Sequence, residues 1–353
     1  MQPCASRAGG LGREIRAHRV CLCYVRGREK PMDRRQFIAG ATASACWPSF
    51  AMAQQPKKVS RIFWVSTESQ PDPFVEGFRE GLREFNFLEG RDYNIELRYA
   101  PGNPAALATV VSELEPQNVD LAVSSGPAIL AMRKVTRIPV LFAVSGDPID
   151  LGIVKSMARP EGNFTGSTFM SKDVAAKRVD LLKEIFPNLR RLAVLSNSVH
   201  PGERSEWQVT QQGAQALGIE PVYIPFTGPQ EIDKALADLA TTSADAMLVF
   251  PDGVTMVHRK KVAQAAIDRR LPSMFGWGEY CDAGGLLSYG ANQRATYVRL
   301  AGYAVRILKG ESPSNLPVEQ PTKFELVVNL RTAKAVGIEV APSILLRAER
   351  TIE

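Results

Sequence analysis

The sequence contains little cysteine and little histidine, and both shortages limit what the protein does. Four of its five cysteines precede residue 47, so only Cys281 remains in the later part of the chain. A disulfide within the segment after residue 53 is therefore excluded, and so is a metal site built from several thiolates. His200 and His258 are the only histidines of that segment, and they lack the spacing of a His-Glu-x-x-His zinc motif.

Nucleotide-binding motifs are also missing. No Gly-x-x-x-x-Gly-Lys run occurs, and the GWGEYC segment at 276–281 has Cys281 where a dinucleotide fingerprint needs its third glycine. The commoner role for such a cysteine is that of a small buried thiol. We therefore expect no cofactor, no metal and no catalytic residues, with an enzyme kept as one alternative.

An excess of positive charge is missing from most of the chain. The formal net charge of +6 arises before Gln54, because residues 1–31 hold seven basic and two acidic residues and residues 32–53 hold two and one. From Gln54 onward, 34 basic residues balance 34 acidic residues. A nucleic-acid-binding surface normally needs a concentrated basic face, so we expect no nucleic-acid partner.

The amino-terminal residues have the order of an export signal. Met32 precedes the pair Arg34 and Arg35, a short apolar stretch follows at 37–47, and an AMA cleavage site stands at 51–53. The arginine pair resembles a twin-arginine signal, which directs a bacterial protein to the periplasm. We interpret 32–53 as a signal peptide that is cleaved near Ala53.

Two further features of this region concern processing. Residues 1–31 read as an upstream segment that is non-native or disordered, which leaves the true translation start open. A lipoprotein site at Cys46 is the alternative to cleavage near Ala53, although Ala43 stands where leucine is usual.

After Gln54, apolar segments typical of buried strands alternate with helical segments in two successive series. The first series predicts strands at 62–65, 93–99, 121–123, 138–144 and 164–169, and helices at 74–85, 105–114, 128–132 and 150–158. The second predicts strands at 191–195, 221–224, 246–250, 272–275, 285–289 and 324–328, and helices at 174–186, 207–217, 229–239, 256–269, 297–308 and 330–336. The aromatic stripe of the first helix is expected in the core, and His258 is expected on the surface of its helix. Such alternation predicts an α/β fold of two lobes, each a parallel sheet flanked by helices, with a ligand between them.

The stretch from 119 to 148 is the most informative one. An apolar run ends at Ser124, Ser125 and Gly126, and Pro127 then fits the first turn of a short helix. We expect the two serines to cap that helix, whose free N–H groups favour a carboxylate or phosphate. In parallel sheets, ligands bind beyond the carboxyl ends of the strands. The alternative is that the serines serve only the cap and the turn.

Several motifs together resemble a known family. They are PVEQPTKFELVVN at 317–329, RILKG at 306–310, DAGGLLSYG at 282–290, GIV at 152–154 and ARPEGNFTG at 158–166. This pattern resembles the substrate-binding proteins of ABC transporters, a family that includes tryptophan-importer binding proteins. The family is similar to the type I periplasmic binding proteins, in which two lobes joined by three crossover strands form a clamshell.

The resemblance implies where the lobes and the site lie. Lobe 1 would hold 56–165 plus 291–318, and lobe 2 would hold 166–290 plus 319–353. The ligand-binding residues would come from the strand-end loops of both lobes: Ser66, Thr67, Ser124, Ser125, Gly126 and Asp147 from lobe 1, and Asn197, Asp252 and Tyr289 from lobe 2. The segment Asn197-Ser198-Val199-His200 departs from the aromatic or Pro-Ala sequence that family members often have there.

The expected ligand follows from these side chains. Asp147 and Asp252 would meet an amine, the Ser124–Gly126 loop would meet a carboxylate, and Trp277 and Tyr289 would supply a flat apolar wall or belong to the core. Amino-acid-like ligands and small aromatic acids are favoured, with sugars second. The resemblance implies a monomer that delivers its ligand to an ABC permease and ATPase in the membrane, and an exported sensor for a membrane receptor is the alternative.

The export signal gives the first prediction. Because the arginine pair and the AMA site direct cleavage near Ala53, mass spectrometry of the mature protein should find Gln54, or a residue close to it, at the amino end. Recovery from the cytoplasm of a chain that begins at Met1 would contradict this interpretation.

Overall fold

The structure is a computed structural model that describes residues 58–67, 72–101, 103–135 and 137–353. The export signal, its cleavage site and Cys46 lie outside the described residues. Pro56–Glu353 forms one compact unit. Among the described helices, none is both long enough and apolar enough to cross a membrane.

The first lobe is built on a five-stranded parallel sheet. Its strand order is β2-β1-β3-β4-β5. The strands are β1 (Ser60–Ser66), β2 (Tyr93–Tyr99), β3 (Leu121–Ser125), β4 (Val140–Val144) and β5 (Phe164–Thr168). All of them pair in parallel, as the alternating sequence pattern predicts.

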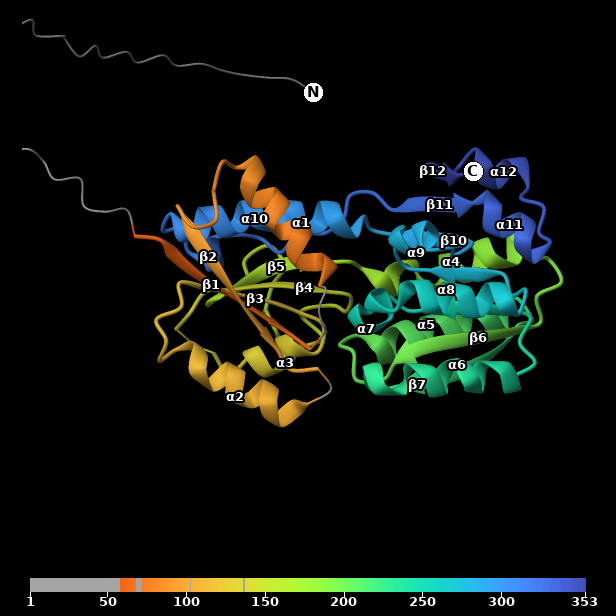
Figure 1. Cartoon of the computed structure of the whole chain (residues 1–353), viewed down its shortest axis with the longest axis horizontal. Helices are drawn as coiled ribbons and strands as arrows, with labels where there is room; N and C mark the ends of the chain where they lie inside the picture. Colours follow the sequence, from red (N-terminus) through yellow and green to blue (C-terminus); the bar gives the residue numbers. More distant parts are fainter. Residues whose placement is uncertain (1–57, 68–71, 102, 136) are drawn as a thin grey trace, which may run out of the picture. The chain divides into compact units, whose positions relative to one another are not determined.

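Helices cover both faces of this sheet (Figure 1). They are α1 (Pro73–Glu84) and α10 (Gln293–Leu308) on one face, and α2 (Pro104–Leu114) and α3 (Ala128–Met132) on the other. Because side chains alternate along a strand, Ile62 and Trp64 of β1 pack under α1 and α10, whereas Phe63 and Val65 pack under α2 and α3.

The second lobe is built on a seven-stranded sheet of order β12-β11-β10-β9-β8-β6-β7. Its strands are β6 (Arg191–Asn197), β7 (Glu220–Phe226), β8 (Ala246–Val249), β9 (Ser273–Phe275), β10 (Leu287–Gly290), β11 (Glu325–Asn329) and β12 (Arg350–Ile352). All neighbours are parallel except β10 and β11, which run antiparallel. The antiparallel pair arises where the chain returns from the first lobe to extend this sheet.

The helices of the second lobe also lie on both faces. Those on one face are α6 (Ile232–Thr241) and α8 (Arg259–Asp268), and those on the other are α4 (Ser171–Ile185), α5 (Glu203–Ala216), α11 (Leu330–Val336) and α12 (Pro342–Leu345). Short helices complete the lobe: α7 (Gly253–Val257), α9 (Glu279–Asp282) and the 3₁₀ turn η1 (Pro229–Glu231).

The chain passes between the two sheets after β5, after β10 and after the 3₁₀ turn η2 (Pro313–Asn315). The first and third passages lie side by side: Thr168 N donates to the Glu319 carbonyl at 3.0 Å, and Glu319 N donates to the Gly166 carbonyl at 2.8 Å. Two lobes joined by adjacent passages confirm the predicted two-lobed α/β fold.

Two helix predictions are wrong, and two further expectations fail in part. Residues 150–158 form turns instead of a helix, because Gly152 takes a φ of +63° that ends the helical course. The helix expected at 256–269 is divided into α7 and α8 at His258, whose Nε2 atom is buried and not on the surface. Phe85, the last member of the aromatic stripe of α1, is 52% exposed because it already lies beyond the helix end.

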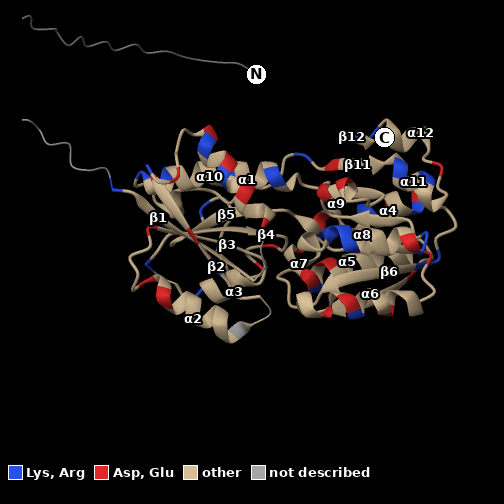
Figure 2. Cartoon of the chain, in the orientation of Figure 1, with Lys and Arg blue, Asp and Glu red and all other residues tan. Residues whose placement is uncertain are grey.

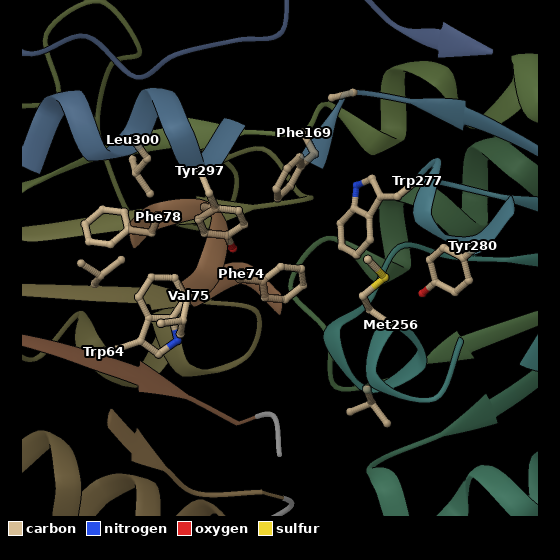
Figure 3. Packing of buried hydrophobic residues seen from close by; sticks show 14 of the residues in the cluster. Trp64, Phe74, Val75, Phe78, Phe169, Met256, Trp277, Tyr280, Tyr297 and Leu300 are labelled. Carbon is tan, nitrogen blue, oxygen red and sulfur yellow. The ribbon is translucent and has the colours of Figure 1, made fainter. Parts of the chain in front are cut away.

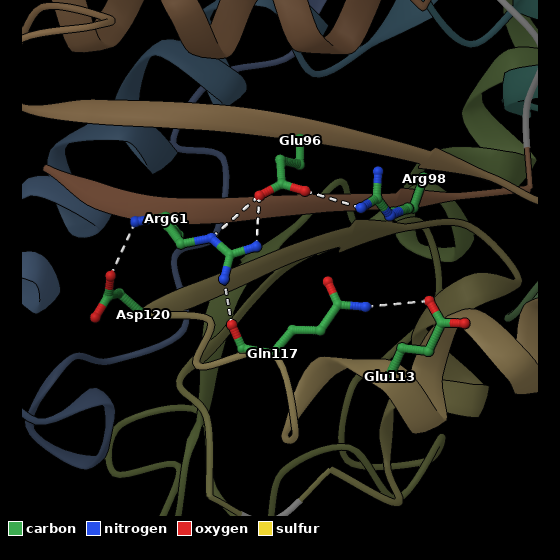
Figure 4. A network of polar contacts seen from close by, with 6 residues as sticks. All are labelled: Arg61, Glu96, Arg98, Glu113, Gln117 and Asp120. Atoms are coloured by element: carbon green, nitrogen blue, oxygen red, sulfur yellow. Dashed lines mark hydrogen bonds and ion pairs between the residues drawn. The ribbon is translucent and has the colours of Figure 1, made fainter.

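Along the described chain, Lys and Arg residues are interspersed with Asp and Glu residues in both lobes (Figure 2). One network joins β1, β2 and the turn before β3 (Figure 4). Arg61 donates to Glu96 at 2.7 Å and, through its backbone N–H, to Asp120 at 2.8 Å, while Arg98 donates to the other oxygen of Glu96 at 2.8 Å. Because these groups are partly exposed, the network fixes local geometry more than it stabilises the fold.

The amino end of α1 shows how a local cap is tied to the core. The Asp72 carboxylate accepts from the backbone N–H of Phe74 at 3.0 Å and from the indole Nε1 of Trp64 at 2.9 Å. Asp72 is buried, and Trp64 is fully buried. The cap therefore fixes where α1 begins and orients the largest side chain of the first lobe.

Asp72 should make the stability of the protein depend on pH. Burial raises the pKa of its carboxyl from 3.8 to about 6, so the folded protein holds this proton more tightly than the unfolded chain does. The free energy of unfolding should therefore fall as the pH rises between these two values, by up to about 3 kcal/mol from this group. Urea denaturation across this range should show the fall in wild type, relative to Asp72→Asn, which cannot titrate here. Equal slopes for the two proteins would contradict the prediction.

Candidate functional site

The two sheets share a feature that determines where polar side chains collect. In the first sheet β1 lies between β2 and β3, and in the second β6 lies between β7 and β8. At such a point, successive connections leave the sheet in opposite directions and open a crevice at the carboxyl ends of the strands. Thr67 and Ser125 stand at this point in the first lobe, and Asn197 and Asp252 stand at it in the second.

Ser124 and Ser125 end β3 with hydroxyls that have no protein partner. Both side chains are buried, and neither Oγ atom makes a hydrogen bond. The expectation that they cap α3 is wrong, because that helix begins with Pro127 in the cap position and no side chain bonds to its first turn. A buried hydroxyl without a partner is costly, so a role in turn chemistry alone does not account for these serines.

The two serines point to opposite faces of the sheet. Ser124 lies in register with Val65 and Phe142, which belong to the face covered by α2 and α3. Ser125 lies in register with Ala143, which belongs to the face covered by α1 and α10. Only Ser125 is therefore directed toward the aromatic side chains that α1 and α10 supply.

Asn197 and Asp252 are bonded to each other. The Asn197 amide donates to Oδ2 of Asp252 at 2.9 Å. Oδ1 of Asp252 accepts from the backbone N–H groups of Val254 at 2.8 Å and Thr255 at 3.3 Å, so Asp252 caps α7. Asp252 is 1% exposed, and both of its oxygens are occupied by protein donors.

Among the described residues, two of the cavities between the lobes are lined by strand-end loops of both lobes. The larger, which we name the outer cavity, has a volume of about 370 Å³ and takes its polar lining from Thr67, Asn103, Asn197, Thr227 and Gln230. The smaller, the inner cavity, has a volume of about 10 Å³. Its lining consists of Phe74, Ser125, Gly126, Ala143, Ser145, Phe169, His200, Gly253, Trp277 and Tyr297. We refer to the two cavities together as the cleft.

Aromatic rings from both lobes meet at the inner cavity (Figure 3). Trp277 of the second lobe lies edge-on to Phe74 of α1, with ring centroids 5.7 Å apart, and edge-on to Phe169 at 5.3 Å. Phe74 in turn stacks on Tyr297 of α10 at 5.1 Å. The hydrophobic cores of the two lobes are thus continuous through these rings.

The backbones of the two lobes also approach closely at a pair of glycines. Gly146 follows β4 of the first lobe, and Gly202 precedes α5 of the second. A Cβ atom added at Gly146 would lie 2.8 Å from the Cα of Gly202. No residue with a side chain at Gly146 could make this contact without a shift of one lobe.

His200 is the one histidine among the described residues that line the inner cavity. Burial lowers the pKa of its imidazole below the ordinary value, against the opposing effects of Asp252, of a hydrogen bond to the Pro201 backbone and of Glu203. The imidazole is therefore neutral at neutral pH, with one ring nitrogen engaged by the Pro201 carbonyl.

A buried ion pair lies behind the second-lobe loops. Arg178 of α4 donates to Glu206 of α5 at 2.5 Å and to the Tyr289 carbonyl at 2.8 Å. Burial raises the pKa of Glu206 to about 7, although Arg178 acts in the opposite direction. Since both side chains are almost inaccessible, the pair joins α4, α5 and β10 into one rigid support for the cleft.

Five predicted site residues lie outside both cavities: Ser66, Ser124, Asp147, Asp252 and Tyr289. Asp147 is exposed and holds its own turn, because its carboxylate accepts from Ile149 N at 2.8 Å. Tyr289 packs its ring near Phe324, with centroids 6.1 Å apart. Ser66 is fully buried at the end of β1, where its carbonyl accepts from Ala100 N at 3.0 Å.

Most of the residues that line the cleft were not among those predicted from the sequence. His200 and Ser145 lie in loops that directly follow β6 and β4, so the strand-end rule could have found them. Phe74, Phe169 and Tyr297 gave no such signal, because an aromatic residue on a helix or crossing segment is usually part of a core.

The sequence matches the family of ABC transporter substrate binding proteins over residues 58–352, so the chain belongs to this family. A tyrosine-binding protein from Clostridioides difficile is 22% identical over 271 residues, which cover 76% of this chain and 77% of the relative.

Solved structures agree with the fold. A conserved domain protein from Vibrio cholerae superposes with a TM-score of 0.76 at 25% identity, over 83% of this chain and 100% of that one. An ABC domain from Streptococcus pneumoniae in complex with L-Trp superposes with a TM-score of 0.74 at 24% identity, over 84% and 100%. The predicted family and type I fold are confirmed, and the family consists of substrate-binding proteins and not of enzymes.

The buried ion pair gives a testable prediction. Glu206→Gln should lower the free energy of unfolding by about 3–5 kcal/mol, because Arg178 is then left as an uncompensated buried charge. A double variant, Arg178→Met with Glu206→Leu, removes both charges and should lose less. Urea denaturation of the three proteins checks this, and a double variant less stable than Glu206→Gln would contradict it.

Proposed function

We propose that the protein is the extracytoplasmic solute-binding component of an ABC importer, which captures a small molecule between its lobes and delivers it to a membrane permease. The observation that carries this proposal is the pair of strand-end crevices, one in each lobe, that border the same cleft. Membership of the substrate-binding family supports it. Periplasmic location after twin-arginine export, and action as a monomer, belong to the same proposal.

The lobes are the moving parts in this function. We take lobe 1 as 56–165 plus 291–318 and lobe 2 as 166–290 plus 319–353, except that β5 continues to Thr168 and stays with the sheet of the first lobe. A ligand that touches both lobes binds the closed arrangement more tightly than the open one, so it shifts the population toward closure. The permease then has a means to distinguish loaded protein from empty protein.

The ligand is an amino-acid-like molecule or a small aromatic acid. One relative is named for tyrosine and one solved structure holds L-Trp, which supports a ligand with an aromatic ring. The side chains proposed to contact it are those that line the cleft: Thr67, Ser125, Ser145, Asn197 and His200, with backbone contact at Gly126.

The approach of Gly146 to Gly202 allows closure to be tested. A panel of amino acids, aromatic acids and sugars is first screened by thermal shift, and a compound that stabilises the protein should make the particle more compact in small-angle scattering. Gly146→Ala should weaken binding of that compound by at least about tenfold, because the added methyl group keeps the lobes apart. Calorimetric titration measures the affinity.

A matched control uses Gly77 in α1. A Cβ atom there makes only ordinary contacts, 3.4 Å from the Cβ of Tyr297, and it is remote from Gly202. Gly77→Ala should therefore keep the wild-type affinity. Unchanged scattering at saturating ligand, or equal affinities for the two variants, would count against a clamshell that works by closure.

A further inference from the structure

We propose that His200 determines the ligand specificity of the cleft: its neutral imidazole accepts a hydrogen bond from an ammonium group of the ligand. The cleft then takes an amino acid in preference to the aromatic acid of the same skeleton. This inference rests on the proposed function, because it assigns a role within the same cleft and chooses between its two ligand classes.

His200 lies where two cavities meet. It lines the inner cavity together with Ser125 and Ser145. It also lines a pocket of the second lobe that has no room for a water molecule, which we name the acidic pocket. The other residues of the acidic pocket are Ser196, Asn197, Glu203, Glu206, Phe250, Pro251 and Asp252. Among the described residues, His200 alone lines both the inner cavity and the acidic pocket.

Two carboxylates of the acidic pocket have no cationic partner among the described residues. Glu203 accepts from the Tyr223 hydroxyl at 2.7 Å and from the Ser196 hydroxyl at 3.3 Å. Asp252 accepts from a side-chain amide and from backbone N–H groups. All of these donors are neutral, so the negative charge is not cancelled and acts on His200 through a part-buried region of low dielectric. A positive charge beside His200 is therefore favoured.

The imidazole of His200 can accept a hydrogen bond from that positive charge. Its N–H donates to the Pro201 carbonyl, so the other ring nitrogen carries no hydrogen and is an acceptor. Burial lowers the pKa of the ring, which keeps it neutral at neutral pH although Asp252 and Glu203 act in the opposite direction. A hydrogen bond from a charged donor to a neutral acceptor is stronger than one between neutral groups.

The carboxylates themselves do not reach the cleft. Neither Asp252 nor Glu203 lines the inner or the outer cavity, and both oxygens of Asp252 already accept from protein donors. Asp147 is exposed and bonds to the N–H groups of its own turn. The role that the sequence suggested for two aspartates thus falls to His200, with Asp252 acting behind it.

The rest of the inner cavity suits the other parts of an aromatic amino acid. The Ser125 hydroxyl is buried and has no protein partner, so it is available to donate to a carboxylate. Phe74 and Trp277 supply aromatic walls (Figure 3), and an aryl group can enter between them if the lobes part. One cavity therefore presents an acceptor, a donor and two rings.

The test compares ligands that differ only in the amino group. Calorimetric titration uses L-phenylalanine against 3-phenylpropanoate, and L-tryptophan against indole-3-propanoate. We expect the wild-type protein to bind each amino acid at least about tenfold more tightly than its partner. His200→Leu removes the acceptor and should weaken the amino acids at least about tenfold, while the propanoates change by less than about threefold.

Two further variants separate this role from a structural one. His200→Asn offers a neutral amide oxygen as acceptor and should recover part of the preference for the amino acids. His258→Leu removes a histidine that lines neither cavity of the cleft, and should leave all four affinities unchanged. Thermal melts of the unliganded variants show whether a substitution disturbs the fold, and affinities are compared between variants that melt alike.

A pH profile supplies an independent measurement. A protonated His200 cannot accept from an ammonium group and repels it. The affinity of the wild type for L-tryptophan should therefore stay constant from about pH 8 to about pH 6.5, and then fall on acidification by up to about tenfold per unit of pH below the pKa of the ring. The His200→Asn variant should lack this fall. It keeps the other titratable groups around the ring, which are Asp252, Glu203, Glu206, Arg178, Tyr223 and Tyr280.

The outcomes separate this inference from the proposed function. Tighter binding of a propanoate than of its amino acid overturns the inference, and so does an equal loss of both ligands in His200→Leu or an equal pH profile in His200→Asn. Failure of both amino acids to bind also overturns it, and the proposed function then stands if another compound binds and compacts the particle. If the amino acids bind through His200 without compaction, the role of His200 stands and closure is wrong.

Discussion

The reversal of strand order beside β1 and beside β6 is the constraint on which the cleft depends. Parallel strands need crossover connections, and where consecutive connections pass to opposite faces, the sheet edge stays open to a ligand. Each lobe supplies one such opening, and the polar residues that end β3 and β6 border it. The side chains that each opening presents then set the chemistry of the cleft. Ser125 and Asn197 differ in whether their polar groups already have a protein partner. Ser125 keeps a free hydroxyl, whereas Asn197 uses its amide to hold Asp252.

The aromatic rings at the inner cavity serve the core and the site at once. Phe74 and Tyr297 belong to the packing under α1 and α10, and Trp277 extends the same cluster into the second lobe. Rings that pack against each other when the cleft is empty lower the exposure of apolar surface to water. Any molecule that enters between these rings gains affinity only to the extent that it packs against them better than they pack against each other.

Much of this architecture follows from the sequence. Buried parallel strands are short apolar runs bounded by polar residues, so the ends of β1, β3, β6 and β8 were predictable, and with them the general location of the cleft. The face to which a residue points was not predictable where a strand is apolar on both sides, so Ser124 and Ser125 looked equivalent. Asp147 and Tyr289 line neither cavity for a related reason: a polar or aromatic residue near a strand end also serves turns and packing. The contact of Phe74 with Trp277 joins segments far apart in the sequence, and no local pattern encodes it.

The position of α10 has a consequence for how the chain matures. This helix follows β6 to β10 of the second lobe in the sequence, yet it packs on α1 and covers one face of the first sheet. The second sheet in turn is completed by β11 and β12, near residue 352. During synthesis, the first lobe therefore cannot cover this face of its sheet until most of the second lobe has been made. A nascent chain interrupted before α10 would leave the apolar residues of α1 and of this sheet face without the helix that packs on them.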